Sequence, residues 1–167
     1  MNVSYRQIGS ASNQKESKLF VEAYLRLFND PENLPFLSVT GIPFKRETVE
    51  TWLQEADASG IEYHVALGED GCIHAIMVVR EHPVDAFEVL GIVVEEGYRR
   101  MNIGVCLLET ALKRAKEKGH RAVSVAVFAN NKNMLMLAVQ QDFKPVKMEY
   151  HAKWDGEDIV HLKRYLA

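Results

Sequence analysis

The stretch FEVLGIVVEEGYRRMNIGVCLLETALKRAKEK, residues Phe87–Lys118, decides the fold. Its first eight residues, 87–94, are almost all apolar and predict a buried strand. A polar turn over residues 95–98 follows, and the basic run RRMNIG, residues 99–104, leads directly into a helical pattern. A strand, a basic loop and a helix start in this order predict an anion site. The first backbone N–H groups of a helix point outward, and the helix dipole adds partial positive charge.

The helix after this loop is defined by apolar residues at three- and four-residue spacing. They are Leu107, Leu108, Ala111, Leu112 and Ala115. Gly119 is expected to end the helix in the left-handed conformation. Arg99 and Arg100 can bind phosphate oxygens with paired N–H donors. Gly104 lies in the first turn, where we see no core reason for a glycine, so it predicts close approach of a diphosphate to the backbone.

The same stretch has a simpler interpretation, in which a buried strand joins an amphipathic helix and the arginines lie on a solvated turn. Charge favours the anion site. Although the formal net charge is -3, residues 99–121 hold seven Lys/Arg against only Glu109 and Glu117. A local basic field of this size suits a small polyanion. The overall charge and the pI of about 6.1 argue against general nucleic-acid binding.

Length and composition predict one ordinary globular domain over residues 1–167. Cys72 and Cys106 lie within apolar runs and are interpreted as reduced, buried thiols. No apolar stretch approaches the length of a membrane span, and residues 1–10 lack the apolar core of a signal peptide. We therefore expect a cytoplasmic protein with no membrane partner. No two of the six histidines have the helical spacing of a zinc site, so no metal is expected.

The remaining elements follow in order along the chain. Strands are predicted over residues 3–8, 62–67, 72–80, 122–128, 146–153 and 159–166, and helices over residues 13–29, 46–56 and 130–141. A loop is expected over residues 81–86. Residues 34–44 are too apolar for a plain surface loop and either pack on the core or form a substrate wall. This mixture of elements predicts a mixed sheet with helices on both faces.

With these elements in place, the chain resembles the GNAT superfamily of N-acetyltransferases over nearly its whole length. The family signature is Arg or Gln, any two residues, Gly, any residue, then Gly or Ala. Arg99 takes the first position and Gly104 the last, whereas Asn102 stands in place of the first Gly. Asn accepts a left-handed backbone better than most residues, so the loop can keep its shape.

A second pattern of the family lies downstream. Its last helix begins with an Asn, and a Gly-Phe pair places a Phe twelve residues later. Asn131 and Phe143 match this spacing, with Asp142 where Gly is usual. The resemblance implies an α/β (α+β) fold, the GNAT fold. This has a central mixed, mostly antiparallel sheet of about seven strands, with helices on both faces. Analogy with the family also favours a homodimer.

The resemblance further implies acetyl-CoA as cosubstrate. In the family, the backbone of the fourth strand pairs with the pantetheine arm, the loop amides bind the pyrophosphate, and the motif Asn hydrogen-bonds the pantetheine. The donor-binding residues implied here are Ile92, Val93, Val94, Arg99, Arg100, Met101, Asn102, Ile103, Gly104, Val105 and Asn131. This agrees with the anion site predicted from the residues alone.

The chemistry needs a base, because an alkyl amine with a pKa of about 10.4 is a nucleophile only when neutral. Glu88 is the best candidate. It is a carboxylate in an apolar strand, where burial would raise its pKa toward the working pH. It lies eleven residues before Arg99, a spacing similar to that of the base Glu in histone-acetyltransferase members. The alternative is that Glu88 points to solvent near the start of the strand, and His82 is a second candidate beside the acceptor site.

The general acid is harder to assign. The family often uses a Tyr seven residues after the motif Asn, and Ala138 occupies that place. Tyr150 or Tyr165 could replace it, or the CoA thiolate could leave unaided. The missing Tyr favours an alternative hypothesis, in which the protein is not an enzyme but a non-catalytic acyl-CoA-binding or sensor module. A nucleotide-binding domain is disfavoured because the chain has no Gly-Lys-Ser/Thr phosphate loop and no Gly-x-Gly-x-x-Gly turn.

The sequence thus predicts an acetyl-CoA-dependent N-acetyltransferase. It would move the acetyl group to a primary amine by direct attack in a ternary complex. The acceptor would be a small-molecule or peptide amine, and its identity stays open between a polyamine, an amino acid, a peptide N-terminus, an antibiotic and a protein lysine.

Overall fold

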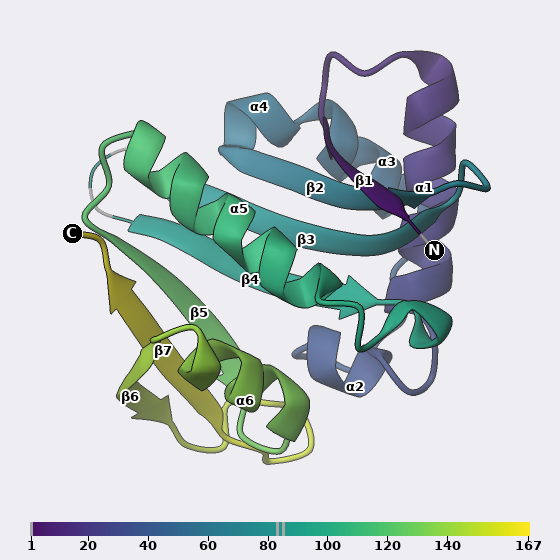
Figure 1. Cartoon of the computed structure of the whole chain (residues 1–167). Coiled ribbons are helices and arrows are strands. Elements are labelled where there is room, and N and C mark those ends of the chain that lie inside the picture. The colour runs from purple at the N-terminus through teal and green to yellow at the C-terminus, as the bar shows by residue number, and fades with distance from the viewer. Residues whose placement is uncertain (1, 83, 85) are drawn as a thin grey trace.

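The strand that begins the deciding stretch, β4 (Ala86–Val94), lies at the centre of a seven-stranded sheet with the order β1-β2-β3-β4-β5-β7-β6 (Figure 1). The computed structural model describes residues 2–82, 84 and 86–167. The other strands are β1 (Val3–Ile8), β2 (Ile61–Gly68), β3 (Ile73–His82), β5 (Ala122–Phe128), β6 (Lys144–Glu149) and β7 (Ile159–Tyr165). Each neighbouring pair is antiparallel except β4 with β5, which is parallel. The predicted mixed, mostly antiparallel sheet is confirmed.

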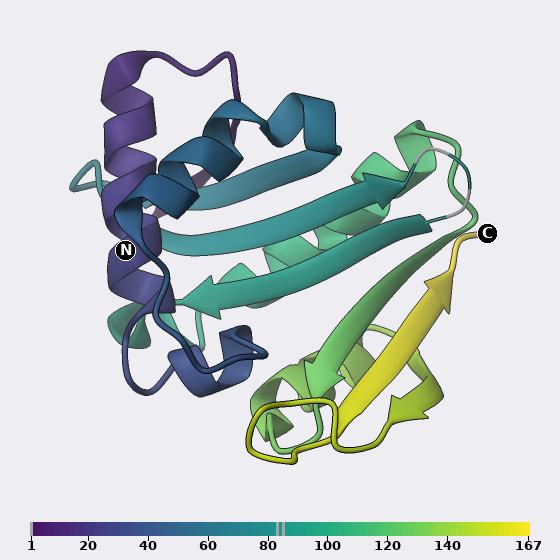
Figure 2. The ribbon, with the colours of Figure 1, turned by 180° about the vertical axis from the view of Figure 1, so that it is seen from behind.

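Helices cover both faces of this sheet. They are α1 (Gln14–Phe28), α2 (Leu34–Leu37), α3 (Arg46–Gln54), α4 (Ala56–Ser59), α5 (Ile103–Glu117) and α6 (Lys132–Gln140), with a 3-10 turn η1 (Glu96–Tyr98). Helix α5 crosses the face nearer the viewer in Figure 1, and α1, α3 and α4 lie on the opposite face, which Figure 2 shows from the front.

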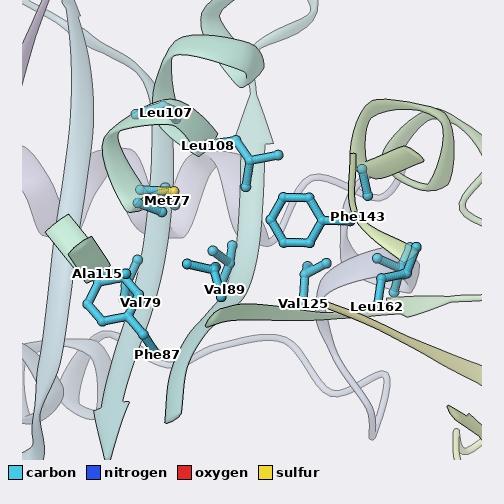
Figure 3. Packing of buried hydrophobic residues seen from close by; sticks show 14 of the residues in the cluster. Met77, Val79, Phe87, Val89, Leu107, Leu108, Ala115, Val125, Phe143 and Leu162 are labelled. Carbon is cyan, nitrogen blue, oxygen red and sulfur yellow. The ribbon is translucent and has the colours of Figure 1, made fainter. Parts of the chain in front are cut away.

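Two apolar cores fill the space between sheet and helices. Figure 3 shows the core under α5 and α6, in which Phe87 of β4 lies beside Ala115 near the end of α5, and Val89 lies below Leu108. The second core, on the other face, joins the inner surfaces of α1, α3 and α4 to β2 and β3. Because each β-strand alternates its side chains between the two faces, both cores draw on the same central strands.

Local signals predicted many boundaries correctly. Asn13 caps α1, accepting a hydrogen bond from the backbone N–H of Glu16 at 2.8 Å. Gly119 follows the end of α5 with φ 83°, the left-handed conformation expected of it. The predicted helix over residues 46–56 is divided, because α3 ends at Gln54 and α4 begins at Ala56.

Two other predictions need correction. Strand β6 ends at Glu149 rather than residue 153, because its pairing with β7 stops there and the chain turns at Lys153, whose N–H bonds Glu157 O at 3.2 Å. The loop expected over residues 81–86 is shorter on both sides, since β3 continues to His82 and β4 begins at Ala86. Pro83 and Asp85 lie outside the described residues.

The cysteines are less buried than their apolar neighbours indicated. Cys72 is exposed, because it lies in the turn between β2 and β3 rather than on the strand. Cys106 is half-buried near the start of α5. Of the helices in the described part of the chain, none has the combined length and apolarity of a transmembrane span.

The central strand is interrupted by a β-bulge that matters for the site. Val79 pairs with Val89 and Val78 pairs with Gly91, so Leu90 has no partner on β3. In an uninterrupted strand Val89 and Val93 would share a face, yet Val89 packs in the α5 core and Val93 in the α1 core. Because of the bulge, the side chains of the strand's last four residues point to the opposite faces of the sheet from those they would have in a regular strand.

Beside this bulge, β4 and β5 separate. Their register covers only Glu88 with Ser124 and Val89 with Val125. Beyond these pairs the two strands diverge, as both views show (Figures 1 and 2). One edge of residues 90–94 is thus left without a strand partner in the middle of the sheet.

Candidate active site

The open edge of β4 includes the predicted pantetheine-binding residues Ile92, Val93 and Val94. Their other edge pairs with β3 from Met77 to Ala75. Interior backbone N–H and C=O groups require hydrogen-bond partners, and an extended ligand with amide groups can supply them as an added strand would. The side chains of Ile92 and Val94 pack on the α5 core, so only the backbone of this segment can take part in such a contact.

The loop after β4 turns the chain sharply into α5. Arg100 and Asn102 both have left-handed backbone, with φ 64° and 59°. The expectation that Asn102 would take this conformation is confirmed, and it explains how Asn can replace Gly in the motif. Asn102 occupies the N-cap position of α5 but makes no side-chain cap. The N–H groups of the first turn, Ile103 to Val105, are therefore not satisfied by capping and suit an anion.

The two motif arginines differ in their surroundings. Arg99 donates from Nε to Val94 O at 3.1 Å and from Nη2 to Asn33 Oδ1 at 2.9 Å. Its side chain thus ties the end of β4 to the segment before α2. Arg100 is exposed and is the arginine better placed to meet a phosphate. Met101 and Ile103 pack on the α5 core, so their contribution to an anion site is through backbone amides.

Gly104 has a packing role that its sequence context did not reveal. A Cβ built at Gly104 would lie 3.2 Å from Leu137 Cδ2, which is closer than ordinary van der Waals contact. Glycine therefore lets α6 approach the first turn of α5. No core reason for glycine was evident from the sequence, and the close approach of the Leu137 side chain supplies one, although that flexible side chain could shift.

Asn131 lies on the other side of the divergence, after β5. It is the N-cap of α6, and its Oδ1 accepts a hydrogen bond from Met134 N–H at 3.2 Å. The amide Nδ2 is not used by this cap and can donate to a ligand. At the far end of α6, Asp142 has φ 64°, which explains why the family favours Gly at that position. Phe143 is buried in the α5 core.

Glu88 lies where β4 and β5 last pair, at the closed end of the divergence. Its side chain is 23% exposed, and Oε2 accepts a hydrogen bond from Arg80 Nη2 at 3.2 Å. His82 Nε2 is 3.9 Å from the same oxygen. Glu88 is therefore neither isolated in the core nor free in solvent. It belongs to a charged cluster with Arg80 and His82. Its role as base stays a prediction.

A cavity of about 450 Å³ opens between the sheet and α1 and α3. Five aromatic residues line it: Tyr24, Phe28, Phe44, Trp52 and Tyr63. On the sheet side the lining includes Arg80, Leu90 and Gly91. The cavity thus reaches from the partner of Glu88 to the residue before Ile92. Leu37 and Phe44 of the apolar segment 34–44 line this cavity and also pack against the second core, so the segment does pack on the core, and its role as a substrate wall stays a prediction.

A polar cluster supports the turn at the end of β4. His74 stacks on Tyr98, with ring centroids 3.8 Å apart, and bonds both Asp70 and Glu95. Burial disfavours protonation of His74, but the hydrogen bonds to Glu95 and Asp70 outweigh it and raise its pKa. Arg26 of α1 pairs with Glu95 as well. Glu95 thus links α1 to the turn that follows β4.

Comparison with known proteins identifies the family. A family model described as the acetyltransferase (GNAT) family matches residues 22–143, more than half of the chain. The chain belongs to the GNAT acetyltransferase family. The comparison with curated proteins gave no match.

Solved structures of this family have the same fold. An N-acetyltransferase from Staphylococcus aureus Mu50 superposes with a TM-score of 0.80 at 18% identity, and 100% of both chains is covered. Ard1 from Thermoplasma volcanium gives 0.78 at 15% identity, covering 100% of this chain and 99% of the other. A phosphinothricin acetyltransferase from Sinorhizobium meliloti, solved in complex with AcCoA, gives 0.74 at 16% identity and covers 100% and 90%.

In this acetyltransferase, the candidates for a general acid are poorly placed. Ala138, at the position where the family often has Tyr, is fully buried in the α5 core. Tyr150 and Tyr165 are 71% and 72% exposed and line neither the cavity nor the loop. Within the described residues no cluster of His, Cys, Asp and Glu side chains is arranged to hold a metal ion.

Proposed function

We propose that the protein transfers the acetyl group of acetyl-CoA to a primary amine by direct attack in a ternary complex. The observation that carries this proposal is the unpaired edge of β4 running directly into the uncapped start of α5. The first feature suits the amides of a pantetheine arm, and the second suits a pyrophosphate. Both occur on one continuous stretch in an acetyltransferase whose family uses acetyl-CoA as donor.

In this proposal the donor lies along residues 92–94, with Asn131 donating to the pantetheine from the opposite strand. The pyrophosphate contacts the amides from Arg99 to Val105. The neutral amine attacks the thioester carbonyl, and a strand N–H among residues 92–94 stabilises the tetrahedral oxyanion. The C–S bond then breaks, the thiolate leaves with CoA, and the amine loses one proton. The products are an N-acetylated amine and CoA.

Glu88 is the proposed acceptor of that proton. Ile92 is four positions further along the strand, which corresponds to about 13 Å in a regular strand. This distance is too great for direct contact between the Glu88 carboxylate and an amine held at residues 92–94. We therefore propose that Glu88 acts through water. Support for such a relay comes from the cavity, whose lining includes Arg80, the partner of Glu88, and Gly91, the neighbour of Ile92.

The test has a binding part and a turnover part. Acetyl-CoA at 100 times its Kd should stabilise the folded protein by about 2.7 kcal/mol, seen as a rise in Tm, and ATP at equal concentration should do much less. Release of free thiol from acetyl-CoA in the presence of an amine panel measures transfer. An ATP effect equal to that of acetyl-CoA would contradict the pantetheine assignment. Tight CoA binding with no acetylation of any amine would support the non-catalytic module instead.

A further inference from the structure

The wall of the 450 Å³ cavity determines which amines can enter it. Tyr24 and Phe28 of α1 stack with ring centroids 3.9 Å apart and an interplanar angle of 7°. Phe44 meets both rings edge-on, at 5.6 and 5.8 Å. Trp52 of α3 continues the wall 5.8 Å from Phe44. These rings brace one another, so the cavity has a preformed apolar side suited to an apolar or aromatic group.

The opposite side of the cavity carries a guanidinium group that is paired with Glu88. Arg80 is the one charged side chain among the described lining residues. Burial raises the pKa of Tyr63 to about 12 and also raises that of Tyr24, so both phenols stay neutral near pH 7. An aromatic wall by itself can attract an ammonium group. The pairing with Glu88 offsets part of the charge of Arg80, but the guanidinium still offers only donors and no acceptor to a second ammonium group, which disfavours polyamines and other dications.

The guanidinium of Arg80 has unused donors. Among the described residues it makes one hydrogen bond, from Nη2 to Glu88 Oε2, and its Nε is buried without a partner. The side chain is 41% exposed, so ligands can reach it. A guanidinium binds a carboxylate through two parallel N–H donors, and a buried donor without a partner is costly. Because Nε is buried, a carboxylate entering the cavity would bind the N–H donors of the terminal Nη1 and Nη2 groups that Glu88 leaves free.

We infer that the acceptor is a small amine that carries both an apolar or aromatic group and a carboxylate. This inference rests on the proposed function and names the substrate class of the same site. The apolar group packs between α1 and α3, the carboxylate binds Arg80, and the amine lies between Gly91 and Glu88. A protein lysine fits poorly, because its side chain brings no carboxylate to Arg80.

The experiment compares three matched probes: phenylalanine, 2-phenylethylamine, which lacks the carboxylate, and alanine, which lacks the ring. The wild-type protein should acetylate phenylalanine with at least about tenfold higher kcat/KM than either of the others. Arg80→Gln should lower kcat/KM for phenylalanine roughly 10- to 100-fold more than for 2-phenylethylamine. Because any disturbance of Glu88 affects both probes, this ratio isolates the carboxylate contact.

A second variant tests the aromatic wall. Trp52 is a partly exposed residue of α3, so its replacement should disturb the fold little. Trp52→Ala should raise KM for phenylalanine while leaving KM for alanine nearly unchanged. If turnover is too slow to measure, titration of phenylalanine into the CoA complex gives the same comparison as binding.

Three results would overturn the inference: equal or better turnover of 2-phenylethylamine or of cadaverine, an unchanged probe ratio in Arg80→Gln, or no binding of phenylalanine to the CoA complex. If acetyl-CoA binds and some other amine is acetylated, the proposed function stands and only the acceptor class fails. If acetyl-CoA does not bind, both fail.

Discussion

The two sides of the proposed site are built in different ways. The donor side consists of backbone groups on one continuous stretch, the end of β4, its loop and the first turn of α5. The acceptor cavity consists of side chains from α1, the segment before α3, α3 itself, β2, β3 and β4. Backbone geometry depends on local conformation, whereas a side-chain wall depends on how distant elements pack. We therefore expect substitutions on the two sides to affect different measurable quantities.

The largest effect is expected at Glu88, where the two sides meet. Glu88→Gln keeps the shape and removes the proton acceptor, so the acetylation rate should fall on the order of 10²–10⁴-fold. CoA affinity, measured by titration, should hardly change. We expect the activity of the parent protein to rise with pH as its base deprotonates, and this rise should disappear in the variant.

Glu81→Gln is the matched control for this variant. Glu81 is a carboxylate on the adjacent strand β3, and it pairs with Lys118 and His120 rather than with Arg80. Its replacement should leave the rate near normal. If Glu88→Gln also retains a near-normal rate, and its activity falls at low pH as in the parent protein, Glu88 is not the base. His82 or a water chain would then take its place.

The next effect concerns stability and the scaffold of the donor side. Arg114 near the end of α5 donates from Nε and Nη2 to both oxygens of Glu62 on β2, at 3.1 and 3.0 Å. Burial opposes ionisation of Glu62, but hydrogen bonds from His64 and Arg114 outweigh it and lower its pKa to about 2. Because the folded-state pKa is below the ordinary value of 4.5, ionised Glu62 stabilises the fold above pH 4.5.

This stabilisation, about 3 kcal/mol, should be lost as pH falls from about 4.5 to 2. Denaturant unfolding across that range measures it. In Glu62→Gln the contribution is absent at neutral pH, so the difference from the parent protein should shrink toward pH 2. Glu22→Gln, which removes an exposed pair with Arg46, should change stability little at any pH. A constant difference at all pH values would mean that Glu62 contributes by packing alone.

The smallest effect is expected at Gly104, where donor binding and packing overlap. Gly104→Val should weaken CoA binding on the order of tenfold, or about 1.4 kcal/mol, because a branched side chain obstructs the approach of a diphosphate. The same side chain would press on Leu137. The double variant Gly104→Val with Leu137→Ala relieves that contact. If CoA affinity recovers in the double variant, Gly104 serves the packing of α6 and not the ligand.

The features that the sequence predicts correctly are those that depend on local conformation, as on the donor side. The left-handed end of α5 at Gly119 depends on neighbouring residues and was predicted correctly, and Asn102 adopts the left-handed backbone that Asn accepts better than most residues. The misassigned features depend on distant contacts. Cys72 looked buried among apolar neighbours, but strand pairing leaves it in a turn, and Gly104 looked free of packing until α6 was in place.

The sequence by itself determined the donor side: a strand, a loop that accepts left-handed backbone, and a helix start with outward N–H groups. These arise within 32 consecutive residues, from local sterics and hydrogen bonding, and the family motif lies within them. Only the tertiary structure decided that β4 parts from β5 beyond Val89, and that Arg80 faces a cavity walled by rings from residues 24 to 63. Such proximity depends on the packing of helices on a twisted sheet, which no local spacing encodes.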